Sequence, residues 1–489
     1  MFAFDSALKP AEVFEAIRKN AENLDAIYLV GGVVRDLLIQ RPVHDIDLVM
    51  AGDARKLAKR VANTLEGDFF VLDSERKTVR VLYPVPGSEK LVIDFAVFRG
   101  DSLEEDLQAR DFTINAMALT LKHPGRLIDP LKGAHDLKNK VIRLCRPDAL
   151  LSDPLRVIRA VRFAVDLGCK ILPETWQLMK DTAPKLAEVS AERKRDETFR
   201  ILGGREISSA FRLLDRAGAL GFIVPGLSGY RGSRTPPLPD EAEHFEAAMV
   251  RLQKLEELLD VLGKTDGRQS AQNMILGAAV LRLNRSRERL REHLDRQISF
   301  GRSARQLLYL AEAIRSTIKG EGLEPDSINK LTVEHARALA LSVMEMKRLE
   351  KTIAGISLFN SLCDLRVELS PTDIYRYFRD VGEAGIDATL LGLAGVLAAH
   401  RSSLPQDLWL KQLAVVEQIW DAWWNHRVEM VNPPQIISGD DLQFQFKIKP
   451  GPMIGMVLEA VREAQVEGKV TSREEAFQFL SRWLAVQNF

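Results

Sequence analysis

Residues 26–50 carry the pattern from which the fold of the first part of the chain can be read: AIYLV at 26–30, GGVVRD at 31–36 and HDIDLVM at 44–50. A short apolar run that ends in Gly31-Gly32 and continues with helical periodicity predicts a strand, a turn and a helix. Such a turn lets backbone N–H groups approach a phosphate, because glycine has no Cβ to block the approach. Most glycine pairs are ordinary turns, so this pair alone is weak support for a phosphate site.

Asp45 and Asp47 open the second apolar run, which we expect to be a strand over 46–50. Residues two apart on a strand point to the same face, so the two carboxylates should lie side by side and repel one another. A Mg²⁺ ion would offset this repulsion, since Mg²⁺ is held by one or two carboxylates together with substrate phosphates. The alternative is that one aspartate caps an element or pairs with a neighbouring arginine.

The first 145 residues mix strand and helix patterns, whereas the remainder is predicted to be helical. Strands are expected at 26–30, 46–50, 69–72, 78–83 and 91–97, and helices at 33–40 and 54–65. Later helical patterns cover 153–167, 176–186, 191–202 and 208–217, and the clearest loop is 228–240. After about Val141 no further strand is expected. The sequence therefore predicts an α+β protein with a mixed sheet in its first part.

The overall composition is that of an ordinary globular protein without a basic excess. Its 489 residues include 68 lysines and arginines and 68 aspartates and glutamates, so the formal net charge is zero. A length of this size suggests about three domains. Neutrality argues against a nucleic-acid partner only if the charges are evenly spread, because a cleft that binds the end of an RNA needs local rather than global positive charge.

The cysteines Cys145, Cys169 and Cys363 lie far apart and show no C-x-x-C spacing. We therefore expect reduced, mostly buried thiols in a reducing compartment. The first 20 residues lack the apolar run of a signal peptide, and no stretch approaches the roughly 18 apolar residues of a membrane helix. The expectation is a cytoplasmic protein with no membrane partner, and no protein partner is evident in the sequence.

The stretch EEDLQARDFTINAMAL at 104–119 is expected to form a helix-like run that begins near Arg110 and Asp111. Arg110 is a candidate for contact with a phosphate or a ribose. A capped helix with an exposed Arg–Asp pair is the simpler alternative.

The stretch SDPLRVIRAVRF at 152–163 places acidic and basic side chains on one side of a helical wheel. The polar side carries Asp153, Arg156, Arg159 and Arg162. A stripe of arginines is usually a solvated face. An aspartate one turn from an arginine can instead act as a template for cytosine and adenine, because their exocyclic amine donates and the adjacent ring nitrogen accepts a hydrogen bond.

Five stretches in unbroken order over about residues 25–227 resemble the bacterial class II tRNA nucleotidyltransferase and poly(A) polymerase family. They are GGVVRD with HDIDLV, EEDLQARDFTINAMAL, IDPLKGAHDLKNKVIRL, SDPLRVIRAVRFAVDLG and VSAERKRDETFRIL. A weaker similarity continues over 438–480. The resemblance implies a polymerase-beta-like nucleotidyltransferase head with a mixed sheet (1–145), followed by an all-α neck (146–227), body (228–400) and tail (401–489).

The same resemblance assigns roles to residues of this chain. Asp45 and Asp47 would be the catalytic carboxylates that bind Mg²⁺, and Asp94 is a candidate third acidic group. The implied nucleotide-binding residues are Gly31, Gly32, Arg35, Arg110, Asp153, Arg156, Arg159 and Arg162. Among these, Asp153 and Arg156 would read the base edge. The implied reaction is phosphoryl transfer from CTP or ATP to the 3′ end of a tRNA, with release of pyrophosphate.

Three departures from the family pattern bear on specificity. Ser152 stands where the family often has glutamate, and Ala109 stands where it often has a first arginine. Neither position reads the base, so we expect these departures to tune the activity rather than to abolish it. The segment between Phe98 and Leu103 is far shorter than the flexible loop that helps CCA-adding relatives switch from CTP to ATP. The short segment favours an enzyme that adds only the two cytidines over one that completes CCA.

Two other functions fit parts of the pattern. A poly(A) polymerase would share the motifs, although that subgroup usually has a basic C-terminal extension, and the chain ends at SRWLAVQNF. A catalytically inactive RNA-binding protein is opposed by the intact motif residues.

The helical remainder gives weaker indications. His244, His293 and His335 show no metal-ligand spacing, so we expect satisfied core or surface histidines and no phosphohydrolase activity of the kind that some relatives carry. The segments 447–452 (KIKPGP) and 469–473 are candidate tRNA contacts or ordinary loops. The tryptophans expected to pack in a core rather than to stack on bases are Trp420, Trp423 and Trp424.

Overall fold

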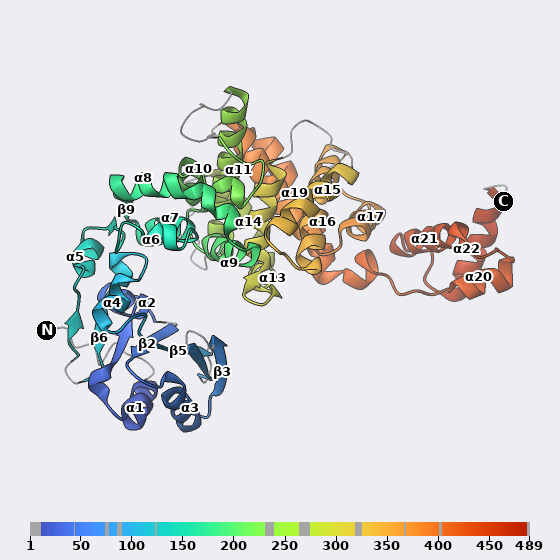
Figure 1. Cartoon of the computed structure of the whole chain (residues 1–489). Coiled ribbons are helices and arrows are strands. Elements are labelled where there is room, and N and C mark those ends of the chain that lie inside the picture. The colour runs from blue at the N-terminus through green and yellow to red at the C-terminus, as the bar shows by residue number, and fades with distance from the viewer. Residues whose placement is uncertain are drawn as a thin grey trace. The chain divides into compact units, whose positions relative to one another are not determined.

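The computed structural model describes residues 11–43, 45–73, 78–85, 90–122, 125–229, 239–263, 274–317, 325–365, 368–400 and 403–486. The chain forms two compact units. The first comprises Met1–Ser190 with Arg216–Ala219, and the second comprises Ala191–Asp215 with Leu220–Phe489. The first unit holds a mixed sheet, and the described part of the second is helical apart from one short hairpin (Figure 1).

Seven strands form the sheet of the first unit, in the order β3-β4-β5-β2-β1-β6-β7. They are β1 (Ile27–Val30), β2 (Asp45–Met50), β3 (Asp68–Asp73), β4 (Thr78–Tyr83), β5 (Leu91–Val97), β6 (Ala118–Thr120) and β7 (Leu127–Ile128). The β2–β5 pair is parallel and the other neighbours are antiparallel. The five strands expected from the sequence are confirmed to within one residue at either end.

Alternation along the central strands separates an apolar face of the sheet from a polar one. Ile46 and Leu48 of β2 and Ile93 and Phe95 of β5 are essentially fully buried. Helix α3 (Ala54–Leu65) packs against β4 and β5, and α1 (Ala11–Asn20) packs against α3. Asp53 caps α3 by accepting a hydrogen bond from the backbone N–H of Lys56. The residues that alternate with the apolar ones, Asp45, Asp47 and Asp94 among them, therefore lie on the opposite face.

The expectation of a helix-like run opened by Arg110 and Asp111 is wrong. Helix α4 (Leu103–Gln108) ends before these residues, a single 3₁₀ turn covers Thr113–Asn115, and the chain continues into β6. The Asp111 carboxylate accepts from the backbone N–H of Phe112 at 2.8 Å, and the Thr113 hydroxyl donates to the buried Asp136 at 2.7 Å. Such side-chain hydrogen bonds compete with helical ones, and pairing with β1 then favours a strand.

Strands also occur beyond Val141, contrary to expectation. β8 (Val141–Ile142) pairs in parallel with β9 (Lys170–Ile171), and β10 (Gln297–Ser299) forms a hairpin with β11 (Arg302–Ser303). None of these strands exceeds three residues, which is too short to leave a period-two pattern in the sequence.

The helices largely follow the predicted ranges. Those of the first unit not yet described are α2 (Gly32–Leu38), α5 (Gly133–Lys138), α6 (Ala149–Ser152), α7 (Arg156–Leu167) and α8 (Pro173–Thr182). The helices that follow are α9 (Ala191–Leu202), α10 (Ile207–Arg216), α11 (Pro239–Gly263), α12 (Met274–Leu283), α13 (Arg287–Asp295), α14 (Ala304–Arg315), α15 (Pro325–Ala338), α16 (Val343–Leu365), α17 (Pro371–Val381), α18 (Ala384–His400), α19 (Gln406–Asn425), α20 (Gly439–Phe446), α21 (Pro452–Val466) and α22 (Arg473–Val486).

Two helical ranges need correction. Helix α7 begins at Arg156 rather than at Asp153, and the range 176–186 is divided between α8 and a 3₁₀ turn over Ala183–Glu188 that contains a proline. Helix α20, for which no range was predicted, has only eight residues and begins with a capping box between Ser438 and Asp441. Most of the loop expected at 228–240 lies outside the described residues.

Helix α18 forms the centre of the second unit. Most of its residues are buried, and it packs against α11, α16, α17 and α19. Trp420 of α19 is fully buried and donates its indole N–H to Thr389 of α18 at 2.9 Å, and Trp423 is also buried. The expectation of core packing is confirmed for Trp420 and Trp423, whereas Trp424 is only partly buried and contacts the ring of Trp420. Helices α20, α21 and α22 pack around a separate apolar cluster that includes Leu442, Val457 and Leu480.

The three cysteines are free thiols, with Cys169 and Cys363 buried and Cys145 partly buried, as expected. Within the described residues no single helix is long and apolar enough to cross a membrane, and the pair α17 and α18 reaches that length only across a bend of 102°.

His293 of α13 lies in a buried charge network of the second unit. Its Nε2 is 2.8 Å from Asp387 and its Nδ1 is 3.2 Å from Glu383, while Arg348 contacts Asp387 at 2.7 Å. Burial alone would lower the pKa of His293, but the two carboxylates outweigh burial and raise it. This histidine is a satisfied core residue, as expected, and an imidazolium is the form that can donate to both carboxylates.

We expect replacement of His293 by glutamine to lower the free energy of unfolding by about 3 kcal/mol at low pH, because a buried ion-pair partner is lost. Since the pKa is raised in the folded state, this stabilisation is fully present below the unfolded value of 6.5 and is lost as the pH rises through the folded value. Urea unfolding of both proteins from about pH 5.5 to about pH 9 should show the difference shrinking. The exposed His426→Gln serves as control. A difference that stays constant with pH would show that His293 is neutral in the fold.

Candidate active site

A row of charged side chains crosses three strands on the polar face of the sheet. Asp47 of β2 lies opposite Asp94 of β5, and Asp94 lies opposite Arg80 of β4. Arg80 donates from Nε and Nη2 to the two oxygens of Asp94, both at 2.8 Å. Asp94 is therefore already neutralised by a bidentate partner. Asp45, two residues before Asp47, is exposed at the start of the strand.

The Asp47 carboxyl is held in an unfavourable electrostatic environment. Its pKa is raised from an ordinary value of 3.8 to about 6, first by burial and then by the charge of Asp94, with a smaller contribution from Asp45; Arg110 acts in the opposite direction. A divalent cation beside Asp45 and Asp47 would relieve this repulsion. Among the described residues no three or more His, Cys, Asp and Glu side chains form a preformed metal site. Two carboxylates completed by substrate phosphates are the kind of donor set that Mg²⁺ uses.

Gly31 brings the turn after β1 against these groups. A Cβ built on it would lie 3.1 Å from Nη1 of Arg110 and 3.5 Å from Oδ2 of Asp47, and its φ of +76° disfavours any other residue. The structure therefore brings together Gly31, Asp47 and Arg110, which come from three separate motifs. A nucleotide phosphate at this turn would meet a guanidinium and a candidate metal-binding carboxylate.

Asp106 of α4 fixes the position of Arg110. The Asp106 side chain is fully buried and accepts from Nε and Nη2 of Arg110 at 3.0 and 2.8 Å, while its other oxygen accepts from the backbone N–H of Arg99 at 3.1 Å. Partial burial and the nearby guanidinium of Arg110 lower the pKa of Arg99, and Arg156 adds to this repulsion. Within the described residues the Arg99 side chain has no ion pair, so it is available to an anionic ligand.

The segment that carries Arg99 is a tight turn. Ser102 caps α4 by accepting from the backbone N–H of Glu105 at 3.2 Å, and the Glu105 side chain accepts from the backbone N–H of Asp101 at 2.9 Å. A Cβ on Gly100 would lie 2.8 Å from the Cβ of Glu105 and even closer to its carboxylate. The five residues from Phe98 to Ser102 thus pack directly against the start of α4.

A second group of arginines surrounds Asp111 and Asn115. Arg159 of α7 donates from Nε and Nη2 to Asp111 at 2.9 and 2.7 Å. Burial alone would raise the pKa of Asp111, but Arg159 outweighs burial and lowers it. Arg35 pairs with Asp36 and donates from Nη1 to Asn115 at 2.7 Å, and Asn115 donates to Asp111 at 3.2 Å. Arg35 and Arg159 are thereby linked through one hydrogen-bond chain.

The ring of Phe163 gathers three of the predicted nucleotide-binding arginines. The guanidinium carbons of Arg35, Arg159 and Arg162 lie 5.2, 5.4 and 4.3 Å from its centroid. An aromatic face attracts cations, which lowers the cost of placing three positive groups close together. Phe163 is an unpredicted positioning residue of this site.

Asp153 and Arg156 are arranged differently from the helical wheel. Asp153 ends α6 in an extended conformation and precedes α7 instead of belonging to it. Arg156 donates to the backbone carbonyls of Ala109, Arg110 and Ala149 at 3.0 to 3.3 Å. Its guanidinium therefore connects α6 to the stretch that carries Arg110.

The sequence predicted most of the charged residues of this region but not the residues that hold them in position. The structure adds Arg80, Arg99, Asp106, Asp111 and Phe163 to the predicted set. Asp106 and Asp111 flank Arg110 at four residues and one residue, a spacing that hints at pairing. The position of Phe163 beside three arginines depends on tertiary contacts, so no pattern in the sequence indicates it.

Comparison with known proteins places these residues in recognised domains. Residues 27–143 match the model described as the poly A polymerase head domain, 168–230 match a probable RNA and SrmB-binding site of polymerase A, and 409–480 match a putative tRNA nucleotidyltransferase domain 2. The CC-adding tRNA nucleotidyltransferase of Geobacter sulfurreducens is 30% identical over 455 residues, covering 93% of this chain and 91% of that protein. This chain belongs to the tRNA nucleotidyltransferase family. The resemblance inferred from the motifs is confirmed.

Members of the tRNA nucleotidyltransferase family share the fold but differ in name. The A-adding tRNA nucleotidyltransferase of Deinococcus radiodurans is 28% identical over 465 residues, covering 93% of this chain and 95% of that protein. A solved complex of a CCA-adding enzyme with CTP matches with a TM-score of 0.63 at 21% identity, over 98% of this chain and 97% of that one. The predicted α+β fold is thereby confirmed, while the family name alone leaves the added nucleotide undefined.

The raised pKa of Asp47 predicts a stabilising loss-of-function variant. The unfolded chain ionises Asp47 near pH 3.8 but the folded chain only near 6, so the ionised group destabilises the fold above that pH. Asp47→Asn should raise the free energy of unfolding of the metal-free protein at neutral pH by up to about 3 kcal/mol. Mg²⁺ should raise the melting temperature of the wild type but not of the variant. The exposed Asp68→Asn is the control; lower stability of Asp47→Asn than of wild type would contradict this electrostatic account.

Proposed function

We propose that this protein is a template-independent tRNA nucleotidyltransferase that adds cytidines to the 3′ end of tRNA and releases pyrophosphate. The observation that carries the proposal is the convergence of Asp47, Gly31 and Arg110 where the central strand β1 ends beside the start of β2. A carboxylate pair, a turn that admits a phosphate and a fixed guanidinium are the parts that phosphoryl transfer needs.

In this proposal Asp45 and Asp47 hold Mg²⁺. When bound, the ion would supply charge neutralisation for the triphosphate and would lower the pKa of the attacking 3′-hydroxyl. The hydroxyl oxygen bonds to the α-phosphorus as the bond to the leaving pyrophosphate breaks. The protein contributes no covalent intermediate, so its residues act by positioning and by charge stabilisation.

The arginines divide into two groups by their surroundings. Arg110 lies beside Asp47 and Gly31, and Arg99 lies near Arg110; we assign both arginines to the β- and γ-phosphates. Arg35, Arg159 and Arg162 gather around Phe163, and we assign them to the sugar and the walls of the nucleotide pocket. Gly32 lies directly beside Arg35 at the start of α2.

Asp153 and Arg156 are assigned to the base edge. Three backbone carbonyls fix both terminal nitrogens of the Arg156 guanidinium. Within the described residues Nε of Arg156 has no hydrogen-bond partner, so it can donate to a base nitrogen. A fixed guanidinium beside a carboxylate favours cytosine and adenine over uracil and guanine, whose donor and acceptor are reversed at those atoms.

The tight turn at Phe98–Ser102 supports addition of two cytidines rather than completion of CCA. Its backbone is held by Glu105 and Asp106, and Gly100 leaves no room for displacement toward α4. A segment held in this way cannot perform the switch from CTP to ATP that the longer family loop assists. ATP-only extension, as in a poly(A) polymerase, is the second candidate, and the inactive RNA-binding protein is opposed by the assembled charges around Asp47.

For the remainder of the chain we propose the division into head (1–145), neck (146–227), body (228–400) and tail (401–489), with the tail binding tRNA. Phe444 is 88% exposed, and the exposed Lys447 and Lys449 lie just beyond it. An aromatic ring next to lysines suits a single RNA strand, because the ring stacks on a base while the cations meet phosphates. Lys469 and Arg473 pair with Glu467 and Asp441, so we consider them weaker candidates.

Nucleotide-by-nucleotide incorporation tests the function. With tRNA lacking its CCA end, we expect two CMP residues from CTP and no AMP when ATP is added afterwards, because the turn at 98–102 is fixed. The assay separates the products by length on a gel with each labelled NTP supplied singly. An added AMP after two CMP would select full CCA addition, long ATP-only tails on unrelated RNA would select poly(A) polymerase, and no incorporation would refute the proposal.

Arg99→Gln tests the assignment of phosphate contacts. We expect about a tenfold rise in KM for CTP, since one charge-assisted hydrogen bond is worth roughly 1.4 kcal/mol. The melting temperature should change little, because the Arg99 guanidinium is repelled by Arg110 and Arg156 as well as attracted by Asp106 and Asp111, and burial and the repulsion from Arg110 outweigh the attraction. Arg99→Lys should restore part of the affinity, and Arg126→Gln, an exposed arginine of the same unit, should behave as wild type. An unchanged KM in Arg99→Gln would remove this residue from the site.

A further inference from the structure

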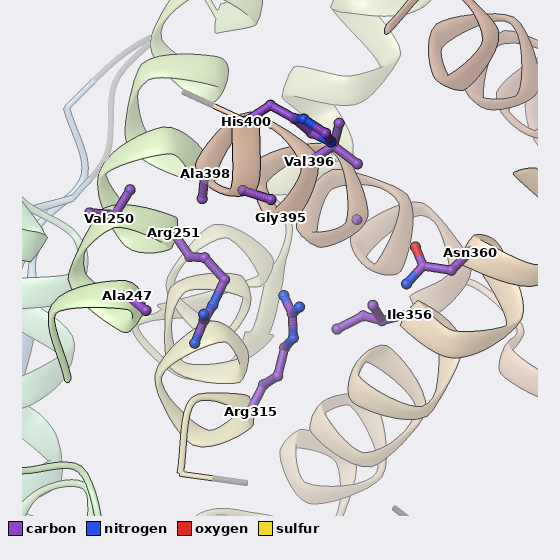
Figure 2. A pocket seen from close by; sticks show the side chains of 12 residues that line it. Ala247, Val250, Arg251, Arg315, Ile356, Asn360, Gly395, Val396, Ala398 and His400 are labelled. Atoms are coloured by element: carbon purple, nitrogen blue, oxygen red, sulfur yellow. The ribbon is translucent and has the colours of Figure 1, made fainter. Parts of the chain in front are cut away.

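The second unit contains a cavity of about 410 Å³ that no motif of the nucleotidyltransferase site explains. Helices α11, α14, α16 and α18 line it, and Figure 2 shows Arg251 and Arg315 reaching toward the space between them. A volume of this size is in the range of small-molecule sites, which run from roughly 300 to 1,000 Å³.

One buried carboxylate fixes both guanidiniums. Glu312 of α14 is fully buried, and its two oxygens accept from Nε of Arg251 at 2.7 Å and from Nη1 of Arg315 at 2.9 Å. Arg251 also donates from Nη2 to Ser316 at 2.9 Å. Buried ion pairs with this geometry hold the two forks in place, so that little side-chain entropy remains to be lost on binding.

The two guanidiniums retain donors for a ligand. Within the described part of the chain, Nη1 of Arg251 and both Nε and Nη2 of Arg315 have no hydrogen-bond partner. Gly395 of α18 contributes to this openness: a Cβ there would lie 3.6 Å from Nη2 of Arg315, and a longer side chain would cover the guanidinium. The donors therefore face the cavity and not a protein acceptor.

The charge of the cavity favours an anion. Two arginines against the single carboxylate of Glu312 leave one net positive charge, and none of the described lining residues is acidic. His400, at the end of α18, also lines the space. A planar guanidinium can donate two parallel hydrogen bonds to the oxygens of a phosphate group. The guanidiniums of Arg251 on α11 and Arg315 on α14 together offer more donors than a halide ion needs, so they favour a phosphate.

The rest of the lining suits an organic remainder. Val250, Ile356 and Val396 provide apolar wall, and Asn360 provides an amide at the rim. A few polar groups in a cavity that also has apolar walls are typical of sites that orient a mixed polar and apolar ligand. A bare phosphate ion would leave most of this volume unfilled.

We propose that this cavity binds a phosphate ester of about nucleotide size, with the phosphate on Arg251 and Arg315 and the remainder against Val250, Ile356 and Val396. The phosphate ester belongs either to a free nucleotide or to a nucleotide of an RNA strand. The cavity is built entirely from residues 247–400 and does not depend on the roles proposed for the carboxylates of the sheet.

Hydrogen exchange of the full-length protein tests the site directly. CMP and tRNA lacking its CCA end are added separately, and exchange is followed in peptides covering 247–251, 312–317 and 392–400. We expect one of the two ligands to slow exchange in all three segments, since residues of each segment line the cavity. Protection by CMP identifies a free nucleotide as the source, and protection by tRNA alone identifies an RNA phosphate. Protection by neither ligand would overturn the proposal.

Two variants separate binding from folding. Arg315→Gln removes one fork but leaves Glu312 paired with Arg251, and Gly395→Leu fills the space without changing charge. Each should raise the ligand concentration for half-maximal protection at least tenfold, while Arg282→Gln, whose arginine pairs with Glu417 elsewhere in the unit, should leave it unchanged. Thermal melting confirms that each variant is folded. Unchanged protection in a folded Arg315→Gln or Gly395→Leu protein would place the ligand outside this cavity.

Discussion

Repulsion among carboxylates on the polar face of the sheet is the constraint around which the first unit is organised. Burial of Ile46, Leu48 and Phe95 on the apolar face fixes the register of β2 and β5, and that register leaves Asp47 beside Asp94. Arg80 pairs with Asp94 and has only a minor effect on Asp47, so the pKa of Asp47 stays raised. The free energy released by packing the apolar face thereby maintains a site that favours a cation.

A recurring device explains how a neutral chain can present positive charge locally. Arginines at the functional regions are held from behind by buried carboxylates: Asp106 holds Arg110, Asp111 holds Arg159, and Glu312 holds Arg251 together with Arg315. The pairing at Glu312 reduces the net charge but leaves guanidinium donors of Arg251 and Arg315 facing the cavity. Equal total numbers of acidic and basic residues are compatible with such an arrangement, and they place no limit on anion binding.

Local periodicity was sufficient to predict the strands around Asp45 and the helix over 54–65. It also placed Asp45 and Asp47 on one face, because the period of a strand is two. It failed after Arg110, where no helix follows: the Asp111 carboxylate accepts from the adjacent backbone N–H of Phe112, and the Thr113 hydroxyl donates to the distant Asp136. Strands of two or three residues such as β8 carry too few residues for any period to be detected.

The composition of the site was predictable from its motifs, whereas its assembly was not. Arg110, Gly31 and Asp47 are separated by up to 79 positions, and only the order of the sheet brings them together. Arg99 has no motif of its own and gains its place from a backbone hydrogen bond to Asp106. Phe163 reads in the sequence as one more apolar residue of a helix, and only the folded chain places three arginines around it.

The turn at 98–102 and helix α4 are structurally coupled. Asp106 accepts from the turn with one oxygen and from Arg110 with the other, so any change in the length of the turn pulls on the group that positions Arg110. A longer loop at this position would need a different residue to hold Arg110 in place. In the proposed function, choice of nucleotide and rate of transfer would therefore be coupled through a single carboxylate, that of Asp106.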